Sequence, residues 1–228
     1  MTRRKAIQTM GVAGAAVLVP RGVRAREAKA PGADAVSVLY DSTRCIGCER
    51  CAVGCAEANG CDEALATGPD PRLTPRTLTV VRAYETSGGR KAFRKVQCMH
   101  CVDPACVSAC MLGAMQKQPD GSVTWNGDLC VGCRYCEIAC PFNVPRFEWD
   151  TPTPELTKCE LCPERRAAGL PPACVERCHM GALAYGRRDE MLAEARRRIE
   201  ENPDRYNPEI YGDGEGGGTS VLYLAKAG

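Results

Sequence analysis

Most cysteines of this chain fall into four short groups, and one group has a spacing that points to a metal cluster. From Cys130 to Pro141 the sequence is C-V-G-C-R-Y-C-E-I-A-C-P. This is Cys-x2-Cys-x2-Cys-x3-Cys-Pro, a spacing whose thiolates hold [4Fe–4S] clusters. Three thiolates two residues apart allow one tight loop to wrap three corners of a cube. The fourth, Cys140, comes after a longer step, where we expect a helix to begin and the side chain to point away.

A run of this kind predicts a partner run, because in proteins with two clusters the fourth cysteine ligates the other cluster. Cys45-Ile46-Gly47-Cys48 opens the first group much as Cys130-Val131-Gly132-Cys133 opens the third, which is an internal repeat. Glycine at this point permits the positive backbone angles that a tight wrap needs. In chain order the four groups are Cys45, Cys48, Cys51 and Cys55 (group one); Cys98, Cys101, Cys106 and Cys110 (group two); Cys130, Cys133, Cys136 and Cys140 (group three); and Cys159, Cys162, Cys174 and Cys178 (group four).

Groups two and four are wider, yet they end alike. Pro104 stiffens the widened loop of group two. Group four carries a long insert, 163–173, and taken alone this group could pass for a zinc site. Cys110-Met111-Leu112-Gly113-Ala114 is echoed by Cys178-His179-Met180-Gly181-Ala182. Because two groups begin alike and two end alike, we expect all four to belong to one architecture.

The composition leaves three explanations for 17 cysteines in 228 residues. A disulfide framework is disfavoured because the cysteines cluster locally instead of joining distant loops. Structural zinc favours paired knuckles with a long spacer, which only group four approaches. Iron–sulfur clusters would also fill the interior of a chain in which only 5% of the residues are aromatic. The net charge of +2 gives no signal for nucleic acid, and we predict no such partner.

Outside the groups, the pattern predicts a few elements and no catalytic motif. We expect strands at 36–40, 78–84, 91–96, 122–125 and 221–224, with a hairpin around residues 87–89. An amphipathic surface helix is expected at 189–201, ended by Pro203, and its three consecutive arginines could face a partner. Cys61 is expected to be a buried free thiol without a role. No dinucleotide fingerprint, flavin motif or catalytic triad is present, so we predict a chain that is not itself an enzyme.

The N-terminus resembles a twin-arginine export signal. Arg3 and Arg4 precede a mildly apolar stretch, 11–19, which is too short to span a bilayer. We predict that residues 1–30 are a signal and disordered linker, that the chain is exported folded to the periplasm, and that cleavage follows Ala25 or Ala30. A plain basic arm is the alternative. No other apolar run approaches eighteen residues, so we expect no transmembrane anchor of its own and membrane association through a partner.

With these spacings in this order, the chain resembles the iron–sulfur (beta) subunit family of respiratory oxidoreductases, of the dimethyl sulfoxide reductase, formate dehydrogenase N and hydrogenase-2 type. The resemblance covers roughly residues 36–225 and implies an α+β fold. Two bacterial dicluster ferredoxin-like modules, with small β-hairpins and short helices, would lie one inserted in the other. Residues 36–66 plus 142–186 would form the outer module, 78–141 the inner module, and 187–228 a C-terminal helix and glycine-rich tail with a strand.

The resemblance also implies four [4Fe–4S] clusters with crossed ligation. The predicted ligands are Cys45, Cys48, Cys51 and Cys178 at site one; Cys55, Cys159, Cys162 and Cys174 at site two; Cys98, Cys101, Cys106 and Cys140 at site three; and Cys110, Cys130, Cys133 and Cys136 at site four. Each oxidised cluster with four thiolates carries about −2. Nearby cations could offset this charge and raise reduction potentials, or could be ordinary surface residues; they are Arg44, Lys95, Arg134, Lys158 and Arg177.

The family function implied is electron transfer. The chain would relay electrons between a catalytic subunit, either a molybdopterin oxidoreductase or a nickel–iron hydrogenase, and an integral membrane subunit that binds quinone or haem. The alternative is a zinc-binding module that docks proteins. His100 and His179 stand beside ligands, and we expect them to support the sites or to lie on the surface.

Overall fold

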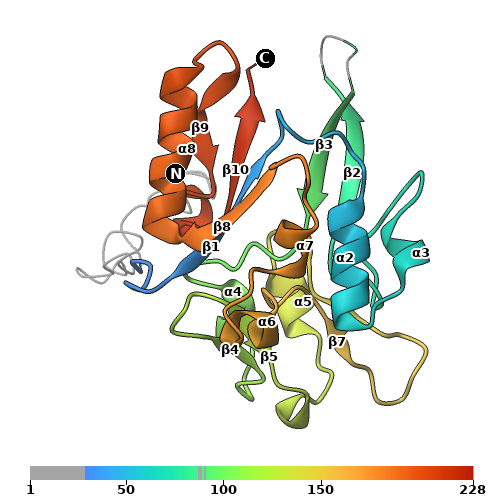
Figure 1. The fold of residues 1–228 in the computed structure, drawn as a ribbon. Helices are drawn as coiled ribbons and strands as arrows, with labels where there is room; N and C mark the ends of the chain where they lie inside the picture. The colour runs from blue at the N-terminus through green and yellow to red at the C-terminus, as the bar shows by residue number, and fades with distance from the viewer. Residues whose placement is uncertain (1–28, 87–88, 90, 228) are drawn as a thin grey trace, which may run out of the picture.

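A computed structural model describes residues 29–86, 89 and 91–227 (Figure 1). The predicted twin-arginine signal and part of the predicted 87–89 turn lie outside these residues. Among the described residues, no helix combines the length and apolar character needed to cross a bilayer.

A four-stranded sheet joins the two ends of the described chain. Its order is β8 (Leu183–Arg187), β1 (Val36–Asp41), β10 (Val221–Lys226) and β9 (Tyr206–Tyr211). β1 runs parallel to β10 and antiparallel to β8, and β9 pairs antiparallel with β10 at the edge. Helix α8 (Arg188–Glu201) covers one face of this sheet (Figure 1). The opposite face of β1 packs against cysteines, so this sheet is the frame on which the first and last cysteine groups are held.

An apolar stripe and a buried ion pair fasten α8 to the sheet. Leu192 and Ala195 pack on Leu39 and Leu222, all of them buried. Arg198, from the same helix, places its Nη1 3.1 Å from Oδ2 of the fully buried Asp41. The predicted amphipathic helix is therefore confirmed. Of its three arginines, Arg198 turns into the protein instead of facing a partner.

Three small hairpins carry the rest of the strand content. β2 (Val80–Glu85) pairs with β3 (Lys91–Val96), β4 (Met115–Lys117) with β5 (Val123–Trp125), and β6 (Arg146–Phe147) with β7 (Leu156–Thr157). The strands predicted at 36–40, 78–84, 91–96, 122–125 and 221–224 are confirmed to within two residues at each end.

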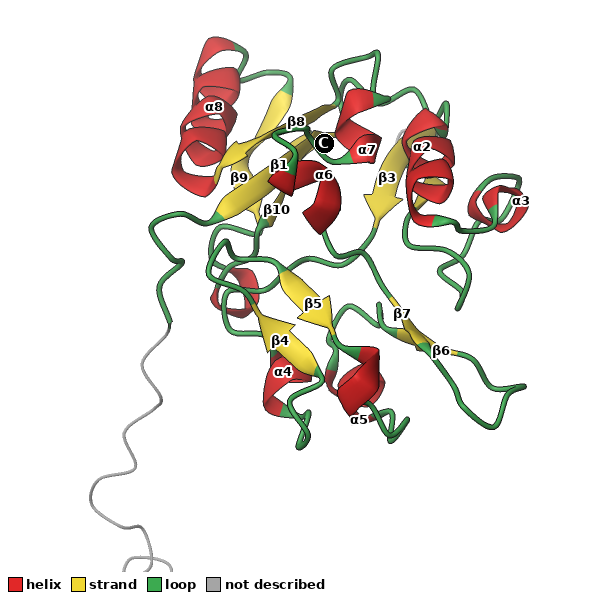
Figure 2. Cartoon of the chain, turned by 60° about the horizontal axis from the view of Figure 1, so that its bottom comes forward, coloured by secondary structure: helices red, strands yellow, loops and turns green. Residues whose placement is uncertain are grey.

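The helices other than α8 are short. They are α2 (Arg50–Asn59), α3 (Glu63–Ala66), α4 (Ala105–Ser108), α5 (Tyr135–Ala139), α6 (Pro163–Ala167) and α7 (Ala173–Glu176), with 3-10 turns at Gly127–Leu129 and Glu215–Gly217. Helices α4 and α5 and the β4–β5 hairpin lie together, away from the four-stranded sheet (Figure 2). The predicted α+β class, with small hairpins and short helices, is confirmed.

One local prediction was wrong. A helix was expected to begin at Cys140, but α5 ends there, and Cys140 is its C-terminal cap with φ −76° and ψ 113°. The reason is Pro141, since a residue that precedes proline is driven out of the helical region.

Candidate iron–sulfur sites

Each of the four groups opens with the same backbone loop. In the first Cys-x2-Cys pair of each group, the residue just before the second cysteine has a positive φ; these residues are Gly47 (71°), His100 (48°), Gly132 (68°) and Leu161 (62°). Left-handed backbone is costly for a side chain as large as leucine, and such strain collects at functional sites. The shared geometry therefore makes groups two and four structural equivalents of the two groups that have glycine.

In each group a helical turn after the loop carries the third cysteine, although in group four helix α6 lies between the loop and that turn. Cys51, Cys106, Cys136 and Cys174 lie in α2, α4, α5 and α7. The fourth cysteine comes four residues later, which on a helix is one turn along the same face. Cys55 stays within α2, whereas the fourth cysteines of the other groups follow the end of their helix. The third and fourth thiols of one group are thus offset along the helix and can serve two different sites.

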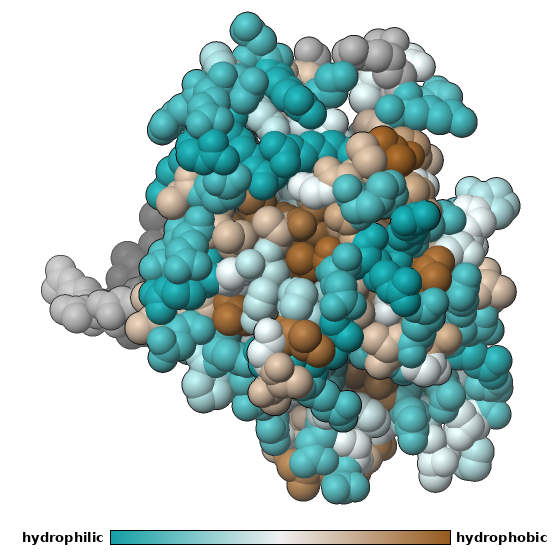
Figure 3. Space-filling view, in the orientation of Figure 1, coloured by the Kyte–Doolittle hydropathy of each residue, from teal (hydrophilic) through white to brown (hydrophobic). Residues whose placement is uncertain are grey.

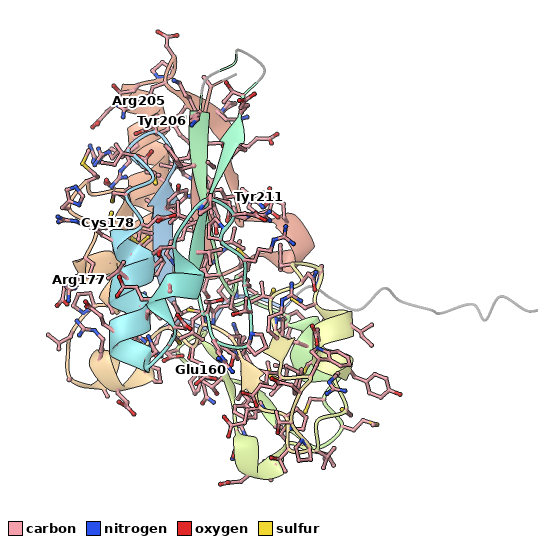
Figure 4. The ribbon with its side chains drawn as sticks, turned by 90° about the vertical axis from the view of Figure 1, so that its right-hand side faces the viewer. Glu160, Arg177, Cys178, Arg205, Tyr206 and Tyr211 are labelled. Atoms are coloured by element: carbon pink, nitrogen blue, oxygen red, sulfur yellow. The ribbon has the colours of Figure 1, made fainter. Side chains whose placement is uncertain are left out.

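The structure brings distant cysteines together in the predicted sets. Cys178, far from group one in sequence, lines a small hollow with Cys45, Cys48 and Cys51. Figure 4 shows Arg177 and Cys178 beside α2, and α7 contacts α2 closely. This hollow is site one.

Site two joins α2 to group four. The Cys55 thiol interacts with the thiols of Cys159, Cys174 and Cys162. Cys55, Cys159 and Cys174 are all buried.

Sites three and four join groups two and three in the same crossed way. The Cys101 thiol interacts with those of Cys98, Cys106 and Cys140, which together form the set of site three. A cavity of about 150 Å³ is lined by Cys110, Cys130, Cys133 and Cys136, the set of site four. All sixteen predicted ligands thus lie with their predicted neighbours, and their roles as ligands stay a prediction.

Electrostatic interactions between thiols of different sets order the sites in a row. Cys51 of site one interacts with Cys174 of site two. Cys159 of site two interacts with Cys98 of site three, and Cys136 of site four interacts with Cys106 of site three. The order along the row is therefore one, two, three, four. Its end sites contain the two exposed cysteines of the chain, Cys48 and Cys133.

The four sets of thiols fit iron–sulfur clusters better than single metal ions. All seventeen cysteines lie in the described part and none is in a disulfide. Among the described residues, no three His, Cys, Asp or Glu side chains come close enough to hold one metal ion. Thiols spread around a hollow suit a cube of iron and sulfide that stands between them.

Two buried N–H groups near these sites also lack an acceptor. His100 is fully buried, and its Nδ1 accepts a hydrogen bond from the Val123 amide at 2.9 Å. Its proton is therefore on Nε2, which has no partner among the described residues. Trp125 lines the site-four cavity, and its Nε1 is likewise buried and unpaired within that part of the chain. Buried donors normally find acceptors, and sulfurs of a cluster could supply them.

Burial keeps the thiols neutral until a metal replaces their protons. Desolvation raises the pKa of Cys51, Cys101, Cys136 and Cys159 to about 12 in each case. Metal binding needs thiolates and releases these protons. His100 also stays neutral, since burial and then Lys158 and Lys117 hold its pKa well below the usual value.

The five cations named from the sequence differ in how far they are buried. Lys95 and Lys158 are buried. Arg134 lines site four and stacks over Trp149, with 3.7 Å between the guanidinium carbon and the ring centroid. Arg177 is exposed and pairs with Glu57, and Arg44 is partly exposed and pairs with Asp41. The two lysines are therefore the cations that water screens least. His100 is buried beside site three, and His179 is exposed.

The glycine-rich tail contacts site three, although the sequence did not indicate a role for it at any site. Thr219 forms an isolated antiparallel β-bridge with Cys101. The Val102 amide donates a hydrogen bond to the Gly218 carbonyl, and the Ser220 amide donates to the carbonyls of Met99 and His100. Gly218 has φ 88°, and a Cβ there would lie 2.9 Å from the Asp213 carbonyl oxygen. The tail thus braces the first loop of site three.

Cys61, expected to be buried, is only partly so, and its Sγ donates to the Asn59 carbonyl at 3.7 Å. It belongs to none of the four sets.

A methyl group added in the first loop should disturb site one. Gly47→Ala would place a Cβ in steric overlap with the Phe93 ring, at a φ of 71°. Gly60→Ala is the matched control, because Gly60 has φ 63° but no atom within 4 Å of the added carbon. Both changes carry the left-handed penalty of about 1–2 kcal/mol, and overpacking should cost Gly47→Ala about 1–3 kcal/mol more. The temperature at which the visible absorption bleaches measures the difference, and equal losses would contradict it.

The sequence of this chain is similar to those of iron–sulfur proteins. The 4Fe-4S dicluster domain family matches residues 90–188. A protein of Nitratidesulfovibrio vulgaris is 43% identical over 99% of this chain and 64% of its own length. The hydrogenase-2 operon protein HybA of Escherichia coli O157:H7 is 38% identical over 88% of this chain and 73% of its own.

The nitrate-inducible formate dehydrogenase iron–sulfur subunit of Escherichia coli K12 is 38% identical over 83% of this chain and 67% of its own. The chain thus spans about two thirds of the length of these relatives. With the thiol sets described above, the similarity shows that the chain carries [4Fe–4S] clusters and belongs to the family of iron–sulfur subunits of respiratory oxidoreductases.

Proposed function

We propose that this chain relays electrons one at a time through four [4Fe–4S] clusters held by the sixteen cysteines in the sets given above. The observation that carries the proposal is the row of sites, linked by Cys51–Cys174, Cys159–Cys98 and Cys106–Cys136, with an exposed cysteine at each end. Electrons can enter at one end and leave at the other. No substrate pocket is needed for this task, which accords with a non-catalytic subunit.

The two ends of the row offer surfaces for two partners. Met111, Leu112, Leu129 and Val131 line the site-four cavity and are exposed, and Ile138 of α5 is 79% exposed. Ile46 and Met180 are exposed at site one. Apolar side chains reach the surface in the middle and at the lower end of the face in Figure 3, between hydrophilic borders. Exposed apolar groups of this kind mark interaction sites.

We infer that one end meets the catalytic subunit, a molybdopterin oxidoreductase or nickel–iron hydrogenase, and the other an integral membrane subunit that binds quinone or haem. The named relatives come from hydrogenase-2 and formate dehydrogenase systems, which supports this choice. The predicted modules accord with the ligand sets. Sites one and two draw only on residues 36–66 and 142–186, and sites three and four only on 78–141.

Anaerobic reductive titration followed by electron paramagnetic resonance tests the relay. The protein should take up about four electrons per chain, one for each cluster. Adjacent reduced clusters should broaden one another's signals because the sites adjoin in a row. Uptake of fewer electrons, or four signals without mutual broadening, would contradict the relay.

We further propose export to the periplasm by the twin-arginine route, from the Arg3-Arg4 pair. Changing both residues to lysine keeps the charge and should retain the iron-loaded protein in the cytoplasm. Cell fractionation and immunoblotting measure this, and unchanged export of the double variant would rule the route out.

A further inference from the structure

Lys95 is a buried cation whose ionic partner is missing from the described protein. It lies on β3, is 1% exposed, and donates from Nζ to Thr79 Oγ1 at 2.8 Å and to Gln97 Oε1. Both acceptors are neutral, and no carboxylate of the described residues forms an ion pair with it. A buried ammonium without a counter-charge is strongly unfavourable. This position therefore calls for an anion.

The groups around the ammonium belong to two neighbouring sites. Lys95 interacts with Cys51 of site one and with Cys55, Cys159 and Cys174 of site two. Neutral thiols would bring no net charge, whereas two ligated clusters bring about −2 each.

We propose that Lys95 is the shared counter-charge of sites one and two and keeps the reduction potentials of both clusters higher than they would otherwise be. The inference rests on the proposed ligand sets. Reduction adds a negative charge to a cluster, and a fixed cation beside it stabilises the reduced form more than the oxidised form. Because Lys95 adjoins both sites, one substitution should move two potentials.

Lys158 provides a comparison at another site. It is also buried, and its Nζ donates to the carbonyls of Val123 and Cys159. Its charge acts on the thiols of Cys98 and Cys106, both of site three. Glu160 lies 3.7 Å from its Nζ and offsets part of that charge. Lys158→Met should therefore lower the reduction potential of site three. This change should be smaller than the changes that Lys95→Met causes in the potentials of sites one and two.

The test is a potentiometric titration of the iron-loaded chain, monitored by electron paramagnetic resonance, for wild type and Lys95→Met. Two of the four midpoint potentials should become more negative. Each of these two midpoint potentials should fall by about 59 mV, which corresponds to a tenfold change in the equilibrium constant of the one-electron reduction. Thr79→Val, which removes a hydrogen bond to Lys95 and keeps the charge, should leave all four nearly unchanged. No shift in Lys95→Met, an equal shift of all four, or the same shifts in Thr79→Val would overturn the proposal.

Metal analysis separates failure of this inference from failure of the ligand scheme. Wild-type protein with zinc, or with far fewer than about sixteen irons, refutes the scheme itself. Full iron with unchanged potentials in Lys95→Met refutes only the role of Lys95. Should Lys95→Met lose iron, Lys95→Arg decides. If Lys95→Arg retains iron and has wild-type potentials, the result supports the need for a positive charge at residue 95. If both variants lose iron, the result contradicts that need.

Discussion

Replacing Cys140 with serine is expected to remove the cluster held by Cys98, Cys101 and Cys106, although Cys140 belongs to group three in sequence. The reason is that Cys140 lies with the group-two thiols at site three. Iron content should fall by up to about four atoms per chain. The spectral component lost should match the one lost in Cys101→Ser and differ from the one lost in Cys133→Ser.

The matched control for this change is Cys61→Ser. Cys61 is a partly buried cysteine outside all four sets, so its replacement should leave iron content and spectra as in wild type. If Cys140→Ser instead abolished the component that Cys133→Ser abolishes, the crossed ligation would be wrong. The assignment of the sites would then have to follow the sequence groups.

Arg198→Met should be the most damaging change away from the sulfurs. Arg198 pairs with Asp41, whose Oδ2 also accepts from the Tyr206 hydroxyl at 2.8 Å. Asp41 ends β1 and is fully buried, so loss of the guanidinium leaves a buried carboxylate short of its main counter-ion. Breaking a buried pair in this way costs about 3–5 kcal/mol. For a chain of this size that is roughly 6–20 °C in the bleaching temperature of the loaded protein.

Arg197→Met is the control on the same helix. Arg197 is 54% exposed, and within the described part of the chain its ion pairs are with Glu194 and Glu201 at the surface. Its replacement should change stability by no more than about 0.5 kcal/mol. Similar losses in the two variants would mean that the buried pair is not what fastens α8 to the sheet.

The cysteine groups were the easiest part of this protein to predict, because their spacing is a direct consequence of how thiolates surround a cube. Helix α8 was also predictable, since its apolar residues Met191, Leu192, Ala195 and Ile199 recur at helical spacing. Helices α4 and α7 are a single turn each, which is too short for periodicity to reveal. Strand β9 contains Pro208, which argues against a central strand but is allowed at an edge, where β9 lies.

Three features of the sites were beyond sequence reasoning for identifiable reasons. The positive φ of His100 and Leu161 carries no residue signature, unlike that of Gly47. Lysine is almost never fully buried, so nothing in the sequence marks Lys95 as interior. The tail near Thr219 reaches Cys101 across more than a hundred residues of chain, a contact that only the fold reveals.

Metal and sulfide content of the chain purified without oxygen tests the central claim most directly. Four [4Fe–4S] clusters require about sixteen irons and about sixteen acid-labile sulfides per chain, with no stoichiometric zinc. Zinc bound in place of iron would contradict the account and favour a structural zinc module. About eight irons would mean that only half of the sixteen cysteines serve as ligands.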